Sequence, residues 1–364
     1  MPRLDHYVTL GRSGLKVSPM CLGAMTFGEE WKFGAEEKVS RNLIDCYLDK
    51  GGNFIDTANS YTNGHSEEII GRHFGQDRAR RDRIVIATKF TSNLHPGDPN
   101  GGGGNRKSII LACEDSLRRL RTDYIDLYWQ HWMDPFTPPE ETMQTLDTLI
   151  RAGKVRYIGI SDTPAWRVVE TQMTALCRGW VPLTALQIEY SLLERTVEAE
   201  LVPMAQRMNL GVTPWGPLRS GVLSGKYSRT SREAESPGRA VMVNPSLTEA
   251  AFRLLDVLVP LARSRGTTPA RMALAWLMAR PGVTAPIIGA RTLAQLEDNV
   301  AALDLTLEPQ DIAALDEVSE PSKPFPVNFL GRLYSASFGG LTINGKSFPP
   351  NTLRPKASLE AAGE

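Results

Sequence analysis

Phe54-Ile55-Asp56-Thr57-Ala58-Asn59-Ser60-Tyr61 reads as a short apolar strand that ends in an acidic residue, with a tyrosine five positions later. Two further strand-like runs end in a similar way, since residues 84–88 lead into Lys89 and residues 125–130 lead into His131. Each run therefore places a titratable side chain at or just beyond the C-terminal end of a strand. That is the place where a (β/α)8 barrel carries its chemistry.

The rest of the chain alternates strand and helix patterns around these three runs. Further strands are predicted near residues 20–23, 155–160, 185–188, 211–213 and 284–287, and helices near 36–50, 66–74, 106–120, 139–152, 164–176, 197–208, 248–265, 269–279 and 293–302. Right-handed parallel crossovers close such a series into a (β/α)8 TIM barrel. An open doubly wound sheet is the competing architecture, but no GxGxxG motif follows the first strand.

The totals of the sequence restrict its function. The 364 residues carry a formal net charge of +0, so no overall field draws the chain to nucleic acid or to an anionic membrane. The four cysteines form no CxxC and the five histidines no HxH, which predicts neither a disulfide framework nor a metal site. The N-terminus shows no signal-peptide pattern and no apolar run is long enough to span a membrane, so a cytoplasmic protein is expected.

Asp56 and Tyr61 in DTANSY, Lys89 in ATKF and His131 in QHW resemble the catalytic tetrad of the aldo-keto reductases. The motifs occur in the family's order and at family-like spacing, and the resemblance extends over residues 7–316. It implies a barrel with an N-terminal β-hairpin plug, expected at residues 7–18, and long loops at the C-terminal face. It also implies an NADP-dependent oxidoreductase that reduces an aldehyde or ketone to an alcohol, or runs the reverse. We expect one domain over residues 1–345 and a loose tail over 346–364.

The resemblance assigns a role to each member of the tetrad. Tyr61 would protonate the carbonyl oxygen, although a phenol with an ordinary pKa of ~10 is a poor acid at neutral pH. The Lys89 ammonium favours the phenolate and should lower the pKa of Tyr61. Asp56 would keep Lys89 charged and oriented, and His131 would orient the substrate carbonyl.

The resemblance also implies residues for the nicotinamide end of NADP(H). Ser161, Asp162 and Gln187 lie at the ends of the fifth and sixth predicted strands, where the family binds the carboxamide. Asp162 replaces the asparagine of many relatives, and a carboxylate can accept a hydrogen bond from the carboxamide but cannot donate one. Trp215 lies where many relatives stack an aromatic ring on the nicotinamide.

Two later segments are expected to hold the phosphates and the adenosine. Residues 216–226 resemble the loop around the pyrophosphate, where free backbone N–H groups would suit phosphate, and residues 288–299 match the phosphate position after the last barrel strands. The guanidinium of Arg291 suits a 2′-phosphate, so NADP is favoured over NAD. The residues expected at this end of the cofactor are Gly216, Leu218, Ser220, Lys226, Gly289, Arg291, Gln295 and Asn299.

Four aromatic residues near the first and fourth strands are expected to line the substrate cleft: Phe27, Trp31, Trp129 and Trp132. Aromatic walls favour a small-molecule carbonyl or alcohol with an apolar body. The long irregular segments 91–105 and 217–245, and the tail as far as about residue 345, are expected to border the cleft.

Two other functions stay open on the sequence. A barrel aldolase would use Lys89 as a Schiff-base nucleophile, but it would leave Trp215 and the segment around Arg291 unexplained. An NADPH-binding regulatory subunit with little turnover would share every residue named above, as do some relatives that are partners of potassium channels. Turnover with a panel of carbonyl compounds separates the regulatory subunit from the reductase.

Overall fold

Eight parallel strands form a nearly closed barrel in the part of the chain that the computed structural model describes, residues 3–75, 77–231 and 237–350. Their order is β10-β3-β4-β5-β6-β7-β8-β9, and a bridge between Val212 and Val283 links the two ends of the sheet. The predicted (β/α)8 TIM barrel is confirmed. The strands are β3 (Cys21–Gly23), β4 (Phe54–Asp56), β5 (Val85–Phe90), β6 (Ile125–Gln130), β7 (Val155–Ser161), β8 (Ala185–Glu189), β9 (Gly211–Trp215) and β10 (Ile287–Gly289).

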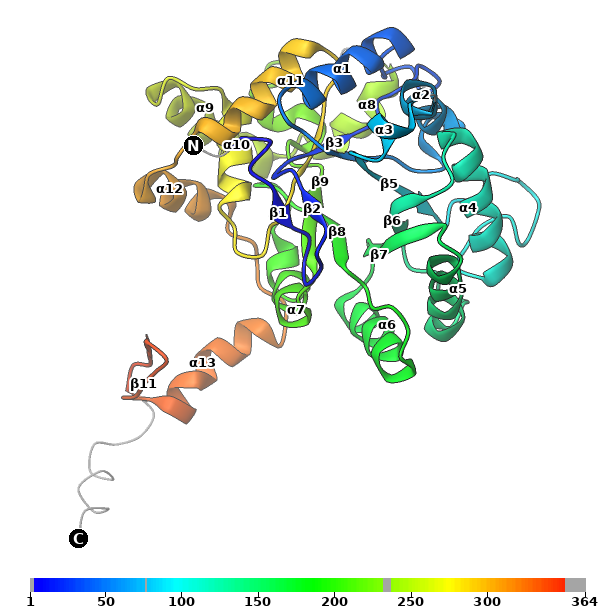
Figure 1. Cartoon of the computed structure of the whole chain (residues 1–364). Helices are drawn as coiled ribbons and strands as arrows, with labels where there is room; N and C mark the ends of the chain where they lie inside the picture. The colour runs from blue at the N-terminus through cyan, green and yellow to red at the C-terminus, as the bar shows by residue number, and fades with distance from the viewer. Residues whose placement is uncertain (1–2, 76, 232–236, 351–364) are drawn as a thin grey trace. The chain divides into compact units, whose positions relative to one another are not determined.

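Helices surround this sheet (Figure 1). Most of them lie within two residues of the expected bounds, because amphipathic periodicity and capping residues define their limits well. The helices of this unit are α1 (Glu37–Asp49), α2 (His65–Phe74), α3 (Arg78–Arg81), α4 (Arg106–Leu120), α5 (Pro139–Arg151), α6 (Ala165–Arg178), α7 (Leu201–Met208), α8 (Pro237–Val243), α9 (Glu249–Ser264), α10 (Pro269–Met278), α11 (Leu293–Val300) and α12 (Pro309–Ser319). Short 3-10 helices are η1 (Tyr61–Gly64), η2 (Thr196–Glu198), η3 (Arg219–Ser224), η4 (Asn244–Ser246) and η5 (Ala301–Asp304).

Apolar side chains pack on both faces of the barrel strands, which is why these strands read as continuous apolar runs. All six residues of β5 are buried. The outward-facing side chains pack against the helices, and the inward-facing ones, such as Phe54, Leu127 and Trp129, fill the barrel. The barrel is therefore a packed core, and polar chemistry is confined to its ends.

The predicted hairpin, β1 (Val8–Thr9) and β2 (Lys16–Val17), covers the N-terminal end of the barrel. Its Leu10 and Val17 are fully buried and belong to the same cluster as the inward-facing strand residues. Gly11 has φ +57°, and a Cβ there would lie 2.4 Å from the carbonyl oxygen of Thr184. Glycine is required at this turn because the hairpin backbone lies against the strand entrances.

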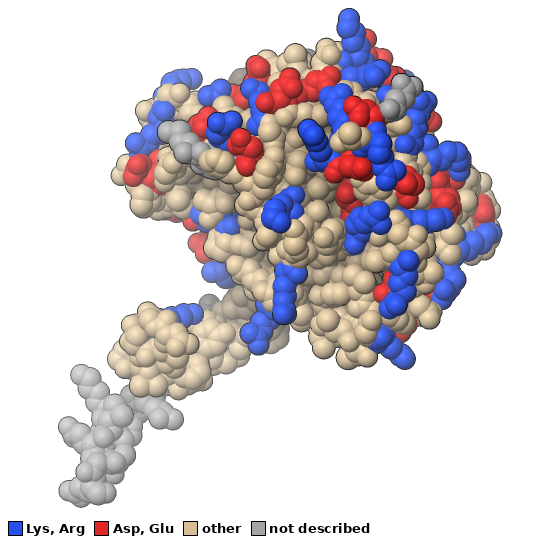
Figure 2. Space-filling model, viewed as in Figure 1, with Lys and Arg blue, Asp and Glu red and all other residues tan. Residues whose placement is uncertain are grey.

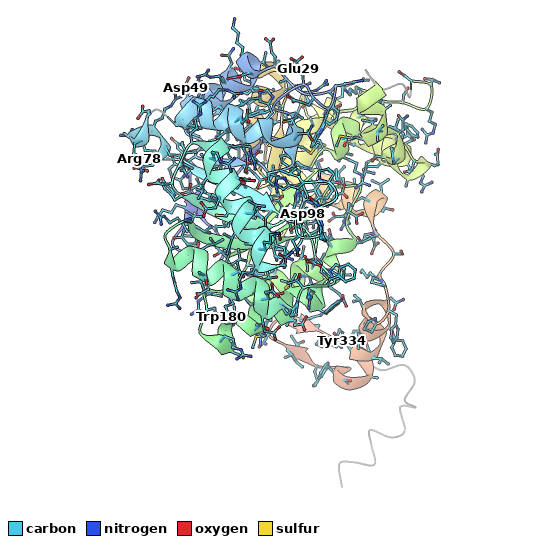
Figure 3. The ribbon with its side chains drawn as sticks, turned by 90° about the vertical axis from the view of Figure 1, so that its right-hand side faces the viewer. Glu29, Asp49, Arg78, Asp98, Trp180 and Tyr334 are labelled. Carbon is cyan, nitrogen blue, oxygen red and sulfur yellow. The ribbon has the colours of Figure 1, made fainter. Side chains whose placement is uncertain are left out.

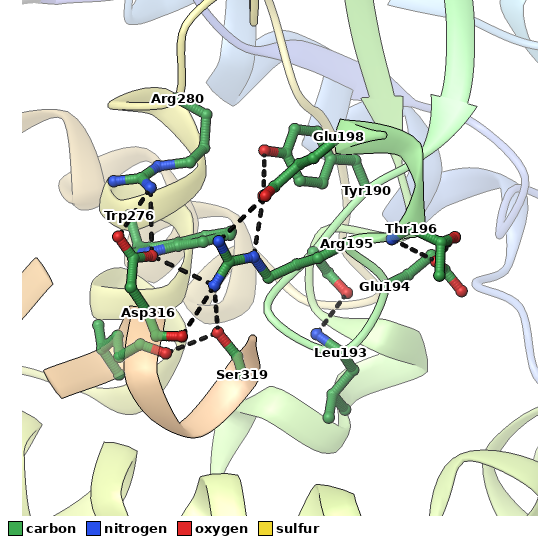
Figure 4. A network of polar contacts seen from close by, with 12 residues as sticks. Tyr190, Leu193, Glu194, Arg195, Thr196, Glu198, Trp276, Arg280, Asp316 and Ser319 are labelled. Carbon is green, nitrogen blue, oxygen red and sulfur yellow. Dashed lines mark hydrogen bonds and ion pairs between the residues drawn. The ribbon is translucent and has the colours of Figure 1, made fainter. Parts of the chain in front are cut away.

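A polar network connects α12 with α10 and with the loop after β8 (Figure 4). Arg195, in the loop after β8, donates to the carbonyl oxygen of Asp316 at 3.1 Å and pairs with Glu198 at 2.8 Å. Trp276 on α10 donates to the Asp316 carboxylate at 2.9 Å, and Arg280 pairs with the same carboxylate. The Asp316 carboxylate thereby gains several donors, which offset the cost of withdrawing it from water.

The last barrel strand begins later than predicted. The expected strand was 284–287, whereas β10 spans Ile287–Gly289. Thr284 still donates to Val212 at 2.8 Å, but Pro286 has no N–H group and cannot continue the hydrogen-bond ladder. The loop over residues 91–105 contains no helix or strand among its described residues, and the 217–245 segment contains η3 and α8.

The described residues after Glu320 belong to a second unit, and the barrel belongs to the first, Met1–Glu320. The sequence indicated few helices there, yet the unit contains α13 (Val327–Phe338) and a hairpin, β11 (Thr342–Ile343) and β12 (Lys346–Ser347). The ring of Phe348 lies 6.3 and 5.4 Å from the rings of Tyr334 and Phe338, which packs the hairpin on the helix. The domain limit at residue 345 stays a prediction, and residues 351–364 of the expected loose tail lie outside the described part.

Acidic and basic side chains alternate over the visible face of the barrel unit (Figure 2). The side covered by α4 and α5 faces the viewer in Figure 3.

None of the described helices is long and apolar enough to cross a membrane. Within the same described residues, no group of three or more histidine, cysteine, aspartate or glutamate side chains could hold a metal ion.

Candidate active site

The four tetrad side chains come together at the C-terminal end of the barrel. Asp56 ends β4, Lys89 lies in β5, His131 follows β6 and Tyr61 begins η1. The Lys89 Nζ donates to the Tyr61 Oη at 2.9 Å, and the rings of Tyr61 and His131 are 5.9 Å apart in an edge-to-face arrangement. Parallel neighbouring strands end at one edge of the sheet, which explains why residues far apart in the sequence meet here.

Lys89 is completely buried and has three hydrogen-bond acceptors. Its ammonium donates to the Asp56 carboxylate, to the carbonyl oxygen of Thr57 at 2.8 Å and to Tyr61. Burial by itself would lower the pKa of Lys89, but the Asp56 carboxylate and the Tyr61 phenol together raise it above its ordinary value. The side chain is therefore a fixed ammonium at neutral pH.

The turn that carries Tyr61 has an unusual backbone. Thr62 and Asn63 adopt left-handed conformations with φ of 48° and 57°, and Gly64 follows with φ of 95°. The Thr62 hydroxyl donates to the carbonyl oxygen of Phe27 at 2.8 Å, which supports this conformation. Non-glycine residues in this region store strain that the surrounding structure must offset, and such strain is concentrated at functional sites.

The pKa of Tyr61 differs from the sequence expectation. Burial raises it above the ordinary value, and the nearby Asp56 carboxylate acts in the same direction, while the Lys89 ammonium opposes both. The expected effect of Lys89 is thus present, but the expected net lowering is wrong because burial is the larger contribution. Tyr61 is a protonated phenol at neutral pH and by itself a weaker acid than a free phenol. The Lys89 ammonium at 2.9 Å favours the phenolate that proton transfer would leave.

His131 is a neutral imidazole. Burial and the Lys89 ammonium lower its pKa to about 2. Its Nδ1 atom is buried and has no hydrogen-bond partner among the described residues. A neutral imidazole can donate from one nitrogen and accept at the other, so the side chain can hold an oxygen of a bound molecule.

A cavity of about 660 Å³ extends from the tetrad along the C-terminal face of the barrel. Asp56, Tyr61 and His131 line it, whereas Lys89 lies behind them in the core. Of the residues expected to bind the cofactor, eleven line this cavity: Asp162, Gln187, Trp215, Gly216, Leu218, Ser220, Lys226, Gly289, Arg291, Gln295 and Asn299. Ser161 is the exception, and its buried Oγ has no hydrogen-bond partner among the described residues.

Polar contacts hold the side chains around Trp215. Gln187 donates to Asp56 at 3.0 Å, which connects the end of β8 to the tetrad. The Trp215 indole nitrogen donates to the Asp162 carboxylate at 2.9 Å. Trp215 and Gln187 are thus each oriented by a carboxylate from another strand end.

The other end of the cavity is formed by a loop and by a helix start. The N–H groups of Arg219 and Gly221 donate to Gly216 and Leu218 within the loop, at 2.8 and 2.9 Å, so these two are not the free donors expected for a phosphate. Near α11, the Arg291 N–H donates to the Gln295 side chain at 2.9 Å.

At the same end, Asn299 donates to the carbonyl oxygen of Gly289 at 3.2 Å. Asn299 therefore stabilises the end of β10, and this bond accounts for its burial.

The expected aromatic wall is only partly present. Trp132 lines the cavity, whereas Trp31 is not among the described lining residues and contacts the Tyr61 ring edge-on at 6.1 Å. Phe27 and Trp129 are fully buried instead, and neither is among the described residues that line the cavity. Trp129 does lie on the inward side with His131, but one layer deeper in the barrel, where it packs against Gly159.

Several lining residues were missed in the sequence. They include Met25, Phe33, Glu189 and Met242. Glu189 could have been found, because it lies two residues after Gln187 on the same strand and so faces the same side. Phe33 and Met25 flank the predicted aromatic positions, but no periodicity marks which loop residues point inward.

A phenol hydrogen-bonded to a buried ammonium, beside a cavity at the mouth of a barrel, is an arrangement that can carry out acid–base chemistry. The family model described as Aldo/keto reductase family matches residues 19–320, and the chain belongs to this family.

Three relatives illustrate the similarity. An uncharacterised oxidoreductase of Bacillus subtilis is 38% identical over 86% of this chain and 95% of its own length. A norsolorinic acid reductase of Aspergillus flavus is 36% identical over 89% of this chain and 84% of its own. A putative aryl-alcohol dehydrogenase of Saccharomyces cerevisiae is 34% identical over 88% of each chain. The chain is thus an oxidoreductase of the aldo/keto reductase type.

Proposed function

We propose that this protein is an NADP(H)-dependent reductase of aldehydes or ketones in which Tyr61 donates the proton to the carbonyl oxygen. The observation that carries the proposal is the hydrogen bond from Lys89 to Tyr61, 2.9 Å long, at the cavity wall. Tyr61 is protonated at neutral pH, but burial raises its pKa and so opposes proton transfer. The Lys89 ammonium then stabilises the phenolate that forms, so the proton transfer costs less.

The other tetrad members support this transfer. Asp56 balances the buried charge of Lys89 and keeps its ammonium directed at Tyr61. His131, neutral and facing the cavity, accepts or donates one hydrogen bond and orients the substrate oxygen toward Tyr61. In the alcohol-oxidising direction, the same phenolate takes the proton back.

The residues along the cavity fit NADP(H). The Gln187 amide is suited to a carboxamide, and the Trp215 ring to an aromatic face. Ser161 does not line the cavity, so a contact between its buried Oγ and the carboxamide stays a prediction. Lys226 and Arg291 supply positive charge for phosphates, and a guanidinium matches the additional 2′-phosphate of NADP(H). When bound, the cofactor supplies or accepts the hydride.

The walls near the tetrad suit a substrate with an apolar, aromatic body. Phe33, Trp132 and Met25 line this part of the cavity. One relative is named for aryl alcohols, which agrees with such walls. We propose aromatic aldehydes and the corresponding alcohols as the substrate class.

The Schiff-base alternative is less compatible with the site. An aldolase lysine must lose its proton to attack a carbonyl, whereas Lys89 is completely buried and its pKa is raised. The described part of the cavity wall does not include Lys89, so a substrate carbon would not reach its Nζ.

The test is a panel of aromatic and aliphatic aldehydes and alcohols, followed by nicotinamide absorbance with NADPH, NADH and their oxidised forms. We expect many turnovers with aryl aldehydes and a preference for NADPH. Oxidation of only one NADPH per protein molecule across the panel would identify a regulatory subunit instead. A substrate adduct trapped on Lys89 by borohydride would identify the aldolase.

A further inference from the structure

Asp162 has a strained backbone and a directed side chain at the end of β7. Its φ is 41°, a left-handed conformation, and its N–H donates to the carbonyl oxygen of Gln187 at 3.1 Å. Its Oδ1 accepts from the indole nitrogen of Trp215 at 2.9 Å. The carboxylate lines the cavity beside Tyr61 and His131, so it lies at the tetrad end.

Charged groups from several elements surround this carboxylate. Lys89 on β5 attracts its negative charge, whereas Glu189 at the end of β8 repels it, although Arg219 pairs with Glu189 and offsets that repulsion. Tyr61 and His131 line the same cavity as neutral groups.

The Asp162 side chain is exposed and lines the cavity. Partial loss of its hydration raises the pKa of Asp162 to about 6, and the Trp215 and Lys89 contacts limit the rise. Asp162 is therefore ionised at neutral pH and protonated in mild acid.

We infer that Asp162 is a positioning residue that holds the Trp215 ring and whose negative charge makes this end of the cavity prefer the oxidised nicotinamide over the reduced one. The inference rests on the proposed function, since it needs a nicotinamide ring at the tetrad end. The oxidised ring carries a positive charge and the reduced ring is neutral. A carboxylate close to the ring attracts the cation by its charge and leaves the neutral ring almost unaffected.

Asparagine is the matched replacement for Asp162. Its side chain has the same shape and its amide oxygen can still accept from Trp215, but it has no charge. D162N therefore separates the electrostatic role from the structural one, and D162A removes both. Glu170→Gln on α6, an exposed residue, removes one negative charge away from the cavity and serves as the control.

The first measurement needs no cofactor. Tryptophan fluorescence of the whole protein is followed from pH 5 to pH 8. The wild-type protein and E170Q should show a transition near pH 6 as the partner of Trp215 loses its proton, and D162N should lack it. A transition that persists unchanged in D162N would exclude Asp162 as the titrating partner of Trp215.

The second measurement compares dissociation constants for NADP⁺ and NADPH by fluorescence titration at pH 6 and pH 8. At pH 8, D162N should shift the affinity ratio roughly tenfold toward NADPH, since one full charge is removed at close range. In the wild-type protein the affinity for NADP⁺ should rise from pH 6 to pH 8, and in D162N this rise should be absent. An unchanged ratio in D162N would refute the inference, whereas a wild-type protein that binds neither nucleotide would refute the proposed function.

Discussion

The two ends of the cavity are built differently. At the end near Tyr61, the strand-built end, the polar side chains lie at or near strand ends and are hydrogen-bonded to one another. At the end near Arg291, the loop-built end, the polar side chains come from a loop and from the start of a helix. Lys89 is buried with three hydrogen bonds, and Asp56 is buried with it. Lys226 and Arg291 line the cavity wall at the other end.

We infer from this difference that one end of the cavity carries out proton transfer and the other end binds the cofactor. A proton donor requires a fixed neighbour at a fixed distance, which strand ends supply because the whole barrel core holds them. Phosphate recognition tolerates more adjustment, since a flexible cation can follow the ligand. Substitutions at the strand-built end should therefore reduce the rate of reaction, and those at the loop-built end should reduce affinity.

The largest expected effect is at the strand-built end. Tyr61→Phe removes the proton donor but retains the ring, so turnover should fall about 10²- to 10⁴-fold, while NADPH binding stays nearly unchanged. Steady-state kinetics with an aryl aldehyde and a fluorescence titration of NADPH measure the two quantities. Tyr7→Phe, which removes a hydroxyl that bonds to Gly51 on the surface, is the control and should retain full activity. Wild-type turnover in the Tyr61 variant would remove this residue from the mechanism.

A smaller effect is expected at the loop-built end. Arg291→Ala should raise the KM for NADPH by roughly 10- to 100-fold, the loss of a charge-assisted hydrogen bond, and change the KM for NADH little. The turnover number should stay close to that of the wild-type protein, in contrast to the Tyr61 variant. Arg207→Ala on α7 removes the same charge from an exposed position and should change neither constant. Equal losses for both cofactors would show that Arg291 does not recognise the 2′-phosphate.

The smallest effect concerns stability. The pKa of His131 is lowered to about 2 in the folded chain, and an unfolded histidine titrates near ~6.5. Between these values the unfolded state binds one more proton, so the free energy of unfolding falls as the pH drops below about 6.5. His131→Gln should make this fall less steep in urea denaturation at pH 7 and pH 5. His95→Gln on the exposed loop is the control, and an identical slope in the His131 variant would contradict the effect.

The tetrad and the barrel could be predicted from the sequence because both depend on local patterns. Asp56, Lys89 and His131 follow apolar runs directly, and parallel strands bring such positions to one edge. The segments expected to bind the cofactor also follow the last strands, and most of their named residues line the cavity; their role in binding stays a prediction. Helix α13 was not predicted. No N-terminal capping residue marks its start, and its aromatic residues do not by themselves distinguish a helix from an irregular tail.

The aromatic wall could not be predicted correctly. Trp129 and His131 share a side of β6, but the sequence does not tell which layer of the barrel each occupies. The depth depends on the stagger of the neighbouring strands and on the space left by Gly159. The turn bearing Tyr61 was likewise invisible, since two non-glycine residues in left-handed conformations have no common sequence signal.

The amino-acid sequence by itself was enough to predict the alternation of strands and helices. It also showed which residues lie at the strand ends and which chemistry their side chains can carry out. Tertiary structure alone decided the direction in which the pKa of Tyr61 shifts, the bond between Asp162 and Trp215 and the burial of Trp129. The physical reason is that a pKa and a buried contact depend on everything within a few ångströms in space, and most of those neighbours are distant in sequence. A strand end, in contrast, is defined by its own few residues.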